Sequence, residues 1–120
     1  MAIRKVLCVD DSATDLKNME QVCAGAGYQV ITATSGKDAV AKAKSEHPDA
    51  ILLDVIMPDM NGFQVCRAIT HDAATKDIPV ILVSSKGEKT DKLWGAEQGA
   101  KGYVTKPYTP DQLLGELKAL

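Results

Sequence analysis

With 120 residues, the chain is long enough for one domain with a sizeable buried core. Its 14 basic and 16 acidic residues give a formal net charge of −2, which argues against nucleic acid or an anionic membrane as a partner held by bulk charge. The three cysteines predict neither a disulfide framework nor a zinc site, because they are odd in number and widely spaced. The apolar runs have only the length of a strand, so we expect no signal peptide, no membrane insertion and a cytoplasmic location.

Short apolar runs alternate with longer amphipathic segments along the chain. The apolar runs predict five strands, at residues 5–9, 28–32, 50–53, 79–83 and 102–105. Each is followed by apolar residues at helical spacing. These segments predict five helices that begin near Ser12, Ser35, Asn61, Thr90 and Thr109.

Strands that alternate with helices predict an α/β fold, here a doubly wound five-stranded parallel sheet with helices on both faces. Right-handed crossovers leave two realistic strand orders, of which the flavodoxin-like order 2-1-3-4-5 suits five strands. That order makes the first and third strands neighbours at the point where open α/β sheets bind their ligands. No linker or repeat divides the sequence, so we expect a single domain over residues 1–120.

Polar residues follow four of the predicted strands. Asp10 and Asp11 follow the first strand, Asp54 the third, Ser84 the fourth and Lys106 the fifth. Each alone has an ordinary structural explanation, such as a helix cap or a solvated loop residue. Because the carboxyl ends of parallel strands share one edge of the sheet, their joint presence there predicts a functional site.

Three carboxylates at one point repel one another unless a cation lies between them. Oxygen ligands select Mg²⁺ or Ca²⁺, and a site with two or three protein oxygens favours Mg²⁺, which keeps several waters and often shares a phosphate oxygen. Asp54 is the best candidate for a carboxylate that forms an aspartyl phosphate, with Asp10 and Asp11 holding the metal ion. Lys106 and Ser84 would stabilise the charge of the phosphoryl group.

The motifs around these residues resemble the receiver domains of two-component response regulators, over essentially the whole chain. The similar segments are Asp10-Asp11-Ser12, Asp54 with Met57–Gly62, Pro79–Ser84 and Gly102–Pro107. The resemblance implies that Asp54 accepts a phosphoryl group from a sensor histidine kinase. It also implies that Mg²⁺ is bound directly by Asp11, Asp54 and the backbone carbonyl of Ile56, and by Asp10 through water.

The same resemblance implies a response to phosphorylation. Ser84 would hydrogen-bond the new phosphoryl group, Lys106 would pair with it, and Tyr103 would turn inward as the coupled switch residue. The peptide bond between Lys106 and Pro107 would be cis.

Two positions depart from the commonest receiver pattern. Ser85 stands where a smaller Ala or Gly is frequent, beside the phosphoryl pocket. Ile56 stands where several fast-cycling receivers carry a polar residue, flanking the path of the attacking water. The apolar side chain at this position predicts slow self-dephosphorylation.

We expect no further domain after the fifth helix, and therefore output through protein contacts. The expected surface combines the fourth helix, the fifth strand and the fifth helix. Leu93 and Ala96 are expected to face inward on the fourth helix and Trp94 outward, where a Trp favours an interface. We expect a monomer or weak dimer without separate substrate turnover. The segment Asp91–Ala100 also resembles receivers of type IV pilus and twitching-motility chemosensory systems.

Two other classes compete with a receiver. A phosphatase of the haloacid-dehalogenase kind would need an acid/base Asp two residues after the nucleophile, where this chain has Ile56. An FMN-binding flavodoxin-like protein would need a hydroxyl-rich phosphate loop after the first strand, where Asp10 and Asp11 would repel a phosphate in the absence of a metal ion. We therefore rank both classes below a signalling receiver.

Overall fold

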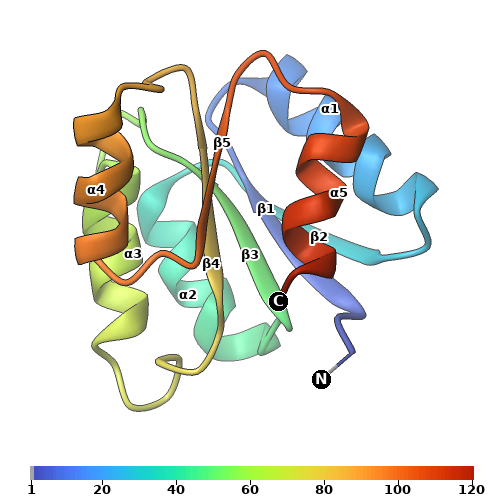
Figure 1. The fold of residues 1–120 in the computed structure, drawn as a ribbon. Helices are drawn as coiled ribbons and strands as arrows, with labels where there is room; N and C mark the ends of the chain where they lie inside the picture. The colour runs from blue at the N-terminus through green and yellow to red at the C-terminus, as the bar shows by residue number, and fades with distance from the viewer. Residues whose placement is uncertain (1) are drawn as a thin grey trace.

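The computed structural model describes residues 2–120, in which five strands alternate with five helices (Figure 1). The strands are β1 (Lys5–Val9), β2 (Gln29–Ala33), β3 (Ala50–Asp54), β4 (Val80–Ser84) and β5 (Gly102–Thr105). The helices are α1 (Ala13–Gly25), α2 (Gly36–Glu46), α3 (Gly62–Thr70), α4 (Lys89–Glu97) and α5 (Pro110–Lys118). Among these helices, none has the length and apolar character that a membrane span requires.

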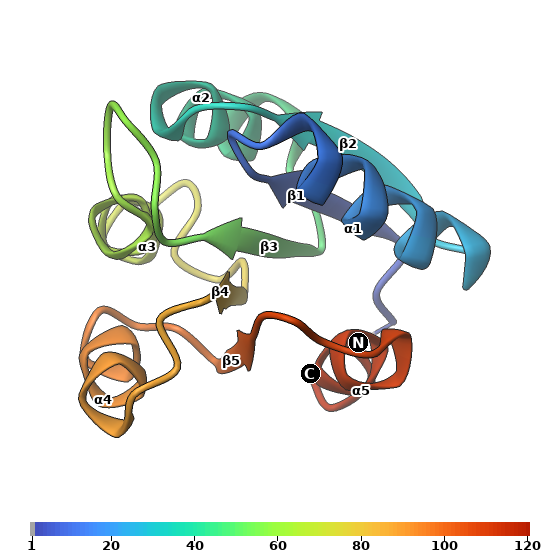
Figure 2. The ribbon, with the colours of Figure 1, turned by 90° about the horizontal axis from the view of Figure 1, so that it is seen from above.

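The strands form one parallel sheet in the order β2-β1-β3-β4-β5, as predicted. Seen from above, α2, α3 and α4 cover one face of the sheet, and α1 and α5 cover the other (Figure 2). The third and fourth strands each extend one residue beyond the predicted end, so Asp54 and Ser84 are the last residues of β3 and β4. The predicted α/β fold is confirmed.

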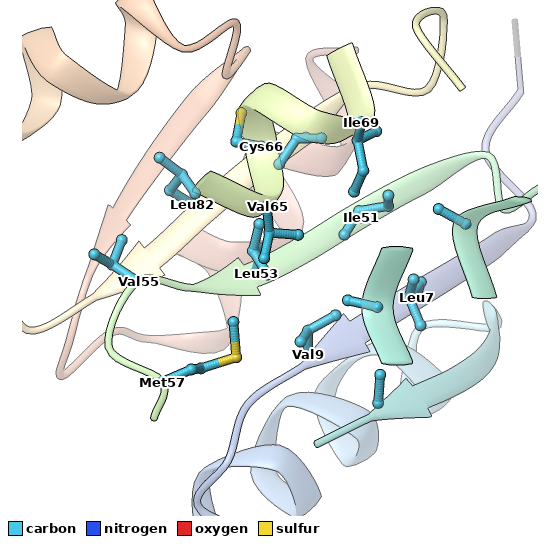
Figure 3. Close-up of a cluster of buried hydrophobic side chains, with 14 residues drawn as sticks. Leu7, Val9, Ile51, Leu53, Val55, Met57, Val65, Cys66, Ile69 and Leu82 are labelled. Carbon is cyan, nitrogen blue, oxygen red and sulfur yellow. The ribbon is translucent and has the colours of Figure 1, made fainter. Parts of the chain in front are cut away.

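Two apolar clusters hold the sheet between its helix layers. On the central strands, neighbouring residues point to opposite faces, so Leu7 packs with the α2–α3 side and Val6 with the α1–α5 side. Figure 3 shows the first of these clusters, in which Ile51 and Leu53 of β3 meet Val65 of α3. Burial of each such side chain stabilises the fold by about 1.5–3 kcal/mol. The central strands are thereby fixed in register, and so are the residues at their ends.

Side-chain caps fix where most of the helices begin. Ser12 Oγ accepts a hydrogen bond from the backbone N–H of Asp15 at the start of α1, and Asn61 and Gln64 form a reciprocal capping box at α3. The predicted start of α4 is one residue late. This helix begins at Lys89 because the Asp91 side chain accepts a hydrogen bond from the backbone N–H of Glu88.

The predicted orientation of α4 is wrong. Leu93 is 58% exposed and Ala96 is also exposed, whereas Gly95 is buried against the sheet. A Cβ on Gly95 would lie 2.7 Å from Leu82 Cδ1, so the helix backbone itself packs on β4. Trp94 does face outward, at 50% exposure, and its ring meets that of Phe63 edge-on at a centroid distance of 6.4 Å.

Candidate functional site

Strand register brings the predicted polar residues to one edge of the sheet. Val9 of β1 pairs with Leu53 of β3, so the residues that follow them, Asp10 and Asp54, lie side by side. On the next pair of strands, Ser84 of β4 is opposite Thr105 of β5, and Lys106 follows directly. The edge predicted from the sequence is confirmed.

Three carboxylates, those of Asp10, Asp11 and Asp54, converge at this edge, which we call the acidic edge. Asp10, Asp11 and Asp54 each offer an oxygen atom, and these atoms lie within 4.8 Å of one another. Asp10 and Asp54 are buried, at 0% and 5% exposure, while Asp11 is exposed to solvent. A hard divalent cation fits this all-oxygen donor set, and the exposed side leaves room for water ligands.

Lys106 is the counter-charge within the cluster. Its Nζ lies 2.8 Å from Asp10 Oδ2 and 3.6 Å from Asp54 Oδ1, and its side chain is 17% exposed. Burial disfavours the charged ammonium, but the hydrogen bonds to Asp10 and Asp15 outweigh it and hold the pKa of Lys106 above its usual value. The lysine therefore stays protonated beside the acids.

Asp54 has a pKa well above the usual value for an aspartate. Burial, and next the neighbouring charge of Asp10, raise the pKa of the Asp54 carboxyl to about 6. Lys106 and the backbone N–H groups of Val55 and Ile56 limit this rise. An ionised Asp54 is thus poorly solvated and has a cation in reach, which suits a nucleophilic carboxylate.

Sequence reasoning missed Asp15 as part of the site. Its Oδ2 lies 3.1 Å from Lys106 Nζ, and its side chain is 50% exposed. An acid in the first turn of a helix is usually explained by the helix dipole, so its residue type gave no signal. Its distance along the chain from Asp11 could have indicated this contact. Helix α1 starts at Ala13, directly after Asp10 and Asp11, so its first turn stays near Lys106.

The hydroxyl of Ser84 faces the loop after β4, where its Oγ accepts a hydrogen bond from the backbone N–H of Lys86 at 3.1 Å. The hydroxyl of Tyr103 donates to the backbone carbonyl of the same Lys86. Burial raises the pKa of Tyr103, and the nearby Ser84 hydroxyl partly offsets this shift. The two side chains therefore meet at one loop, with the half-buried Tyr103 ring on the core side.

The cis bond between Lys106 and Pro107 is confirmed.

The loop after β3 is anchored at both ends. The exposed Asp59 carboxylate accepts hydrogen bonds from the backbone N–H groups of Gly36 and Lys37, which lower the pKa of Asp59 to about 2. The backbone N–H of Gly62 donates to the Val55 carbonyl at 2.7 Å. Between these anchors, Ile56 follows Asp54 by two residues, and its side chain is 52% exposed.

A match to a known protein family covers nearly the whole chain. Residues 6–118 match the response regulator receiver domain. The chain belongs to this family. Receivers of this type are signalling proteins without separate substrate turnover, so the phosphatase and flavodoxin alternatives are set aside. Receiver domains bind Mg²⁺ at an acidic pocket, and Asp10, Asp11 and Asp54 form such a pocket in this receiver.

Individual curated proteins are similar to the receiver along most of its length. Protein PilH of Pseudomonas aeruginosa is 45% identical over 116 residues, which cover 97% of this chain and 96% of PilH. Protein PilG of the same organism is 42% identical over 115 residues, which cover 96% of this chain and 85% of PilG.

Solved structures agree with the observed fold. Chemotaxis protein CheY4 of Vibrio cholerae has a TM-score of 0.91 at 36% identity, over 98% of both chains. CheY of Borrelia burgdorferi, in a complex with CheX, BeF₃ and Mg²⁺, has a TM-score of 0.91 at 30% identity, over 97% of this chain and 87% of the CheY chain.

Proposed function

We propose that this receiver, as a single domain over residues 1–120, carries its signal as a phosphoryl group on Asp54. An Asp54 oxygen attacks the phosphorus of a kinase phosphohistidine, and the phosphorus–nitrogen bond breaks with its electron pair moving to the histidine. The observation that carries the proposal is the position of Asp54: a buried carboxylate next to the acid Asp10 and 3.6 Å from the ammonium of Lys106. Phosphoryl transfer depends mainly on such positioning and charge stabilisation.

Asp11, Asp54 and the backbone carbonyl of Ile56 would hold Mg²⁺, with Asp10 acting through water. The ion supplies a positive charge that offsets both the carboxylates and the incoming phosphoryl oxygens. The convergence of three carboxylate oxygens within 4.8 Å supports this assignment. The related CheY of Borrelia burgdorferi, whose solved complex contains BeF₃ and Mg²⁺, supports it as well.

Phosphorylation would act by shifting an equilibrium between two arrangements of the β4–α4 loop. The Ser84 hydroxyl would leave the backbone N–H of Lys86 for a phosphoryl oxygen. Tyr103, which donates to the Lys86 carbonyl, would then lose its present partner and turn inward. The shared contact at Lys86 supports this coupling of the pocket to the surface of α4, β5 and α5.

The partners in this proposal are a sensor histidine kinase and a target protein. The target binds the surface of α4, β5 and α5, which carries the half-exposed Trp94. The likeness to PilH along nearly its full length supports a receiver that acts without an attached output domain, in pilus-linked motility or taxis. The three buried free cysteines support a reducing, cytoplasmic location.

Intact mass after incubation with Mg²⁺ and acetyl phosphate tests the assignment of Asp54. The wild type is expected to gain one phosphoryl group per chain, whereas Asp54→Ala gains none. Asp38→Ala, which removes a half-exposed acid on α2, is the matched control and should be labelled like the wild type. Labelling of Asp54→Ala at the wild-type level would overturn the assignment.

Ile56→Asn is expected to speed the loss of the phosphoryl group. The exposed Ile56 side chain, two residues after Asp54, offers water no hydrogen bond, whereas an amide can orient an attacking water molecule. We expect the phosphoprotein lifetime to fall several-fold, less than the roughly 10²–10⁴-fold that a positioned general acid or base contributes, because an amide orients water but takes no proton from it. The decay is followed by intact mass after removal of the phosphodonor. An unchanged lifetime would show that Ile56 does not limit water attack.

A further inference from the structure

A cavity of about 370 Å³ lies beside the acidic edge, on the side of α1 and the loop after β5. Its lining residues are Asp15, Asn18, Ser85, Lys106, Pro107 and Tyr108. Asn18 Nδ2 donates to the Tyr108 hydroxyl at 3.1 Å, which ties α1 to this loop at the cavity. Lys106 belongs both to this lining and to the acidic cluster. A group that enters the cavity therefore lies next to the place where the phosphoryl group is transferred.

Asp15 gives this cavity a negative charge. It is the one carboxylate among the six lining residues, and it is half exposed. Lys106 is the single positive charge in the lining. Its Nζ lies 3.1 Å from Asp15 Oδ2, 2.8 Å from Asp10 Oδ2 and 3.6 Å from Asp54 Oδ1, so three acids share this one cation. One cation facing three carboxylates leaves the cavity attractive to positive groups and repulsive to negative ones.

We propose that Asp15 is a specificity-determining residue, which makes the receiver prefer phosphodonors with a protonated nitrogen leaving group over donors with a carboxylate leaving group. The inference rests on the proposed phosphorylation of Asp54. When a protonated phosphorus–nitrogen bond breaks, its electron pair moves to the nitrogen and a neutral amine leaves. When acetyl phosphate reacts, the electron pair moves to oxygen and acetate carries a negative charge away. Asp15 attracts the protonated nitrogen of the first donor as that donor approaches and reacts, and it repels the negative charge that develops on the departing acetate.

The test compares phosphoramidate with acetyl phosphate at the same Mg²⁺ concentration. Initial rates of labelling are read by intact mass for the wild type and for Asp15→Asn, and the measured quantity is the ratio of the two rates. We expect Asp15→Asn to lower the ratio of phosphoramidate to acetyl phosphate labelling by about fivefold. This is the combined size of two exposed charge interactions, the attraction of the protonated nitrogen and the repulsion of the acetate. High salt should move the wild-type ratio toward that of the variant, because Asp15 is half exposed.

Two further variants separate charge from structure. Asp15→Glu keeps the charge and should keep the wild-type ratio. Asp38→Asn removes an acid that is also in a first turn and also bound to one lysine, Lys42, at 3.2 Å, and it should leave the ratio unchanged.

Three outcomes contradict the proposal in different ways. Rates with both donors that stay at the wild-type level in Asp15→Asn overturn the inference and leave the assignment of Asp54 intact. Equal slowing with both donors assigns Asp15 a purely structural role and overturns the inference as well. Absence of labelling of the wild type by either donor overturns the proposed function itself, and with it the role of Asp15.

Discussion

Asp54→Asn is expected to stabilise the metal-free protein by about 2–3 kcal/mol at pH 7.5, because a pKa difference of one between the folded and unfolded states corresponds to about 1.4 kcal/mol. Burial and the charge of Asp10 raise the pKa of Asp54 from 3.8 to about 6. The folded state therefore binds a proton more tightly than the unfolded state does. Ionised Asp54 destabilises the fold, and an amide at this position does not ionise.

The sign of the pH dependence follows from the same pKa change. Between about pH 4 and pH 6 the folded protein holds more protons at Asp54 than the unfolded chain, so the free energy of unfolding falls as pH rises through this window. Above the window the penalty is complete, and below it the penalty is absent. The advantage of Asp54→Asn should therefore shrink toward zero near pH 4.

Urea unfolding in EDTA at several pH values measures this advantage. Asp38→Asn, at a half-exposed site, is the control and should change the free energy of unfolding by no more than about 0.5 kcal/mol. Mg²⁺ should stabilise the wild type more than Asp54→Asn, because ligand binding to the folded state adds to its stability. A variant no more stable than the wild type at pH 7.5 would contradict the burial penalty assigned to Asp54.

The acidic edge could be predicted from the sequence because each of its residues is recognised from the few residues next to it in the chain. Asp10, Asp54 and Ser84 each end or directly follow an apolar run of strand length, and a parallel sheet brings all such ends together. Strand order then follows from the few arrangements that right-handed crossovers allow. Register on the central strands is fixed by side-chain alternation between two apolar clusters, so the residues after Val9 and Leu53 meet.

The orientation of α4 could not be predicted in the same way. Helical spacing counts apolar side chains, and Leu93 and Ala96 have them, but this helix packs on the sheet through Gly95, which has none. The contact of Asp15 with Lys106 was missed for a different reason. It joins residues that are 91 positions apart, and only the folded sheet brings them to one cavity.

Gly62→Ala is expected to cost about 3 kcal/mol of stability, at the upper end of what an added methyl group causes in a packed interior. A Cβ on Gly62 would lie 2.3 Å from the Asp54 carbonyl oxygen and 2.7 Å from Val55 Cα. Both are backbone atoms at the end of β3, so no side-chain rotation relieves the clash. The start of α3 must move away from the strand that carries Asp54, and labelling by acetyl phosphate should slow in the same variant.

Gly115→Ala isolates the steric cause of this loss. Gly115 lies within α5, and an added Cβ there meets no atom within 4 Å, so alanine should stabilise the protein by about 0.5–1 kcal/mol through its better helix propensity. Urea unfolding of the two variants at one pH should therefore give changes of opposite sign. Because both replacements are Gly→Ala in helices, a similar small gain in Gly62→Ala would show that α3 can shift without strain. The close packing of α3 on the end of β3 would then not be what positions Asp54.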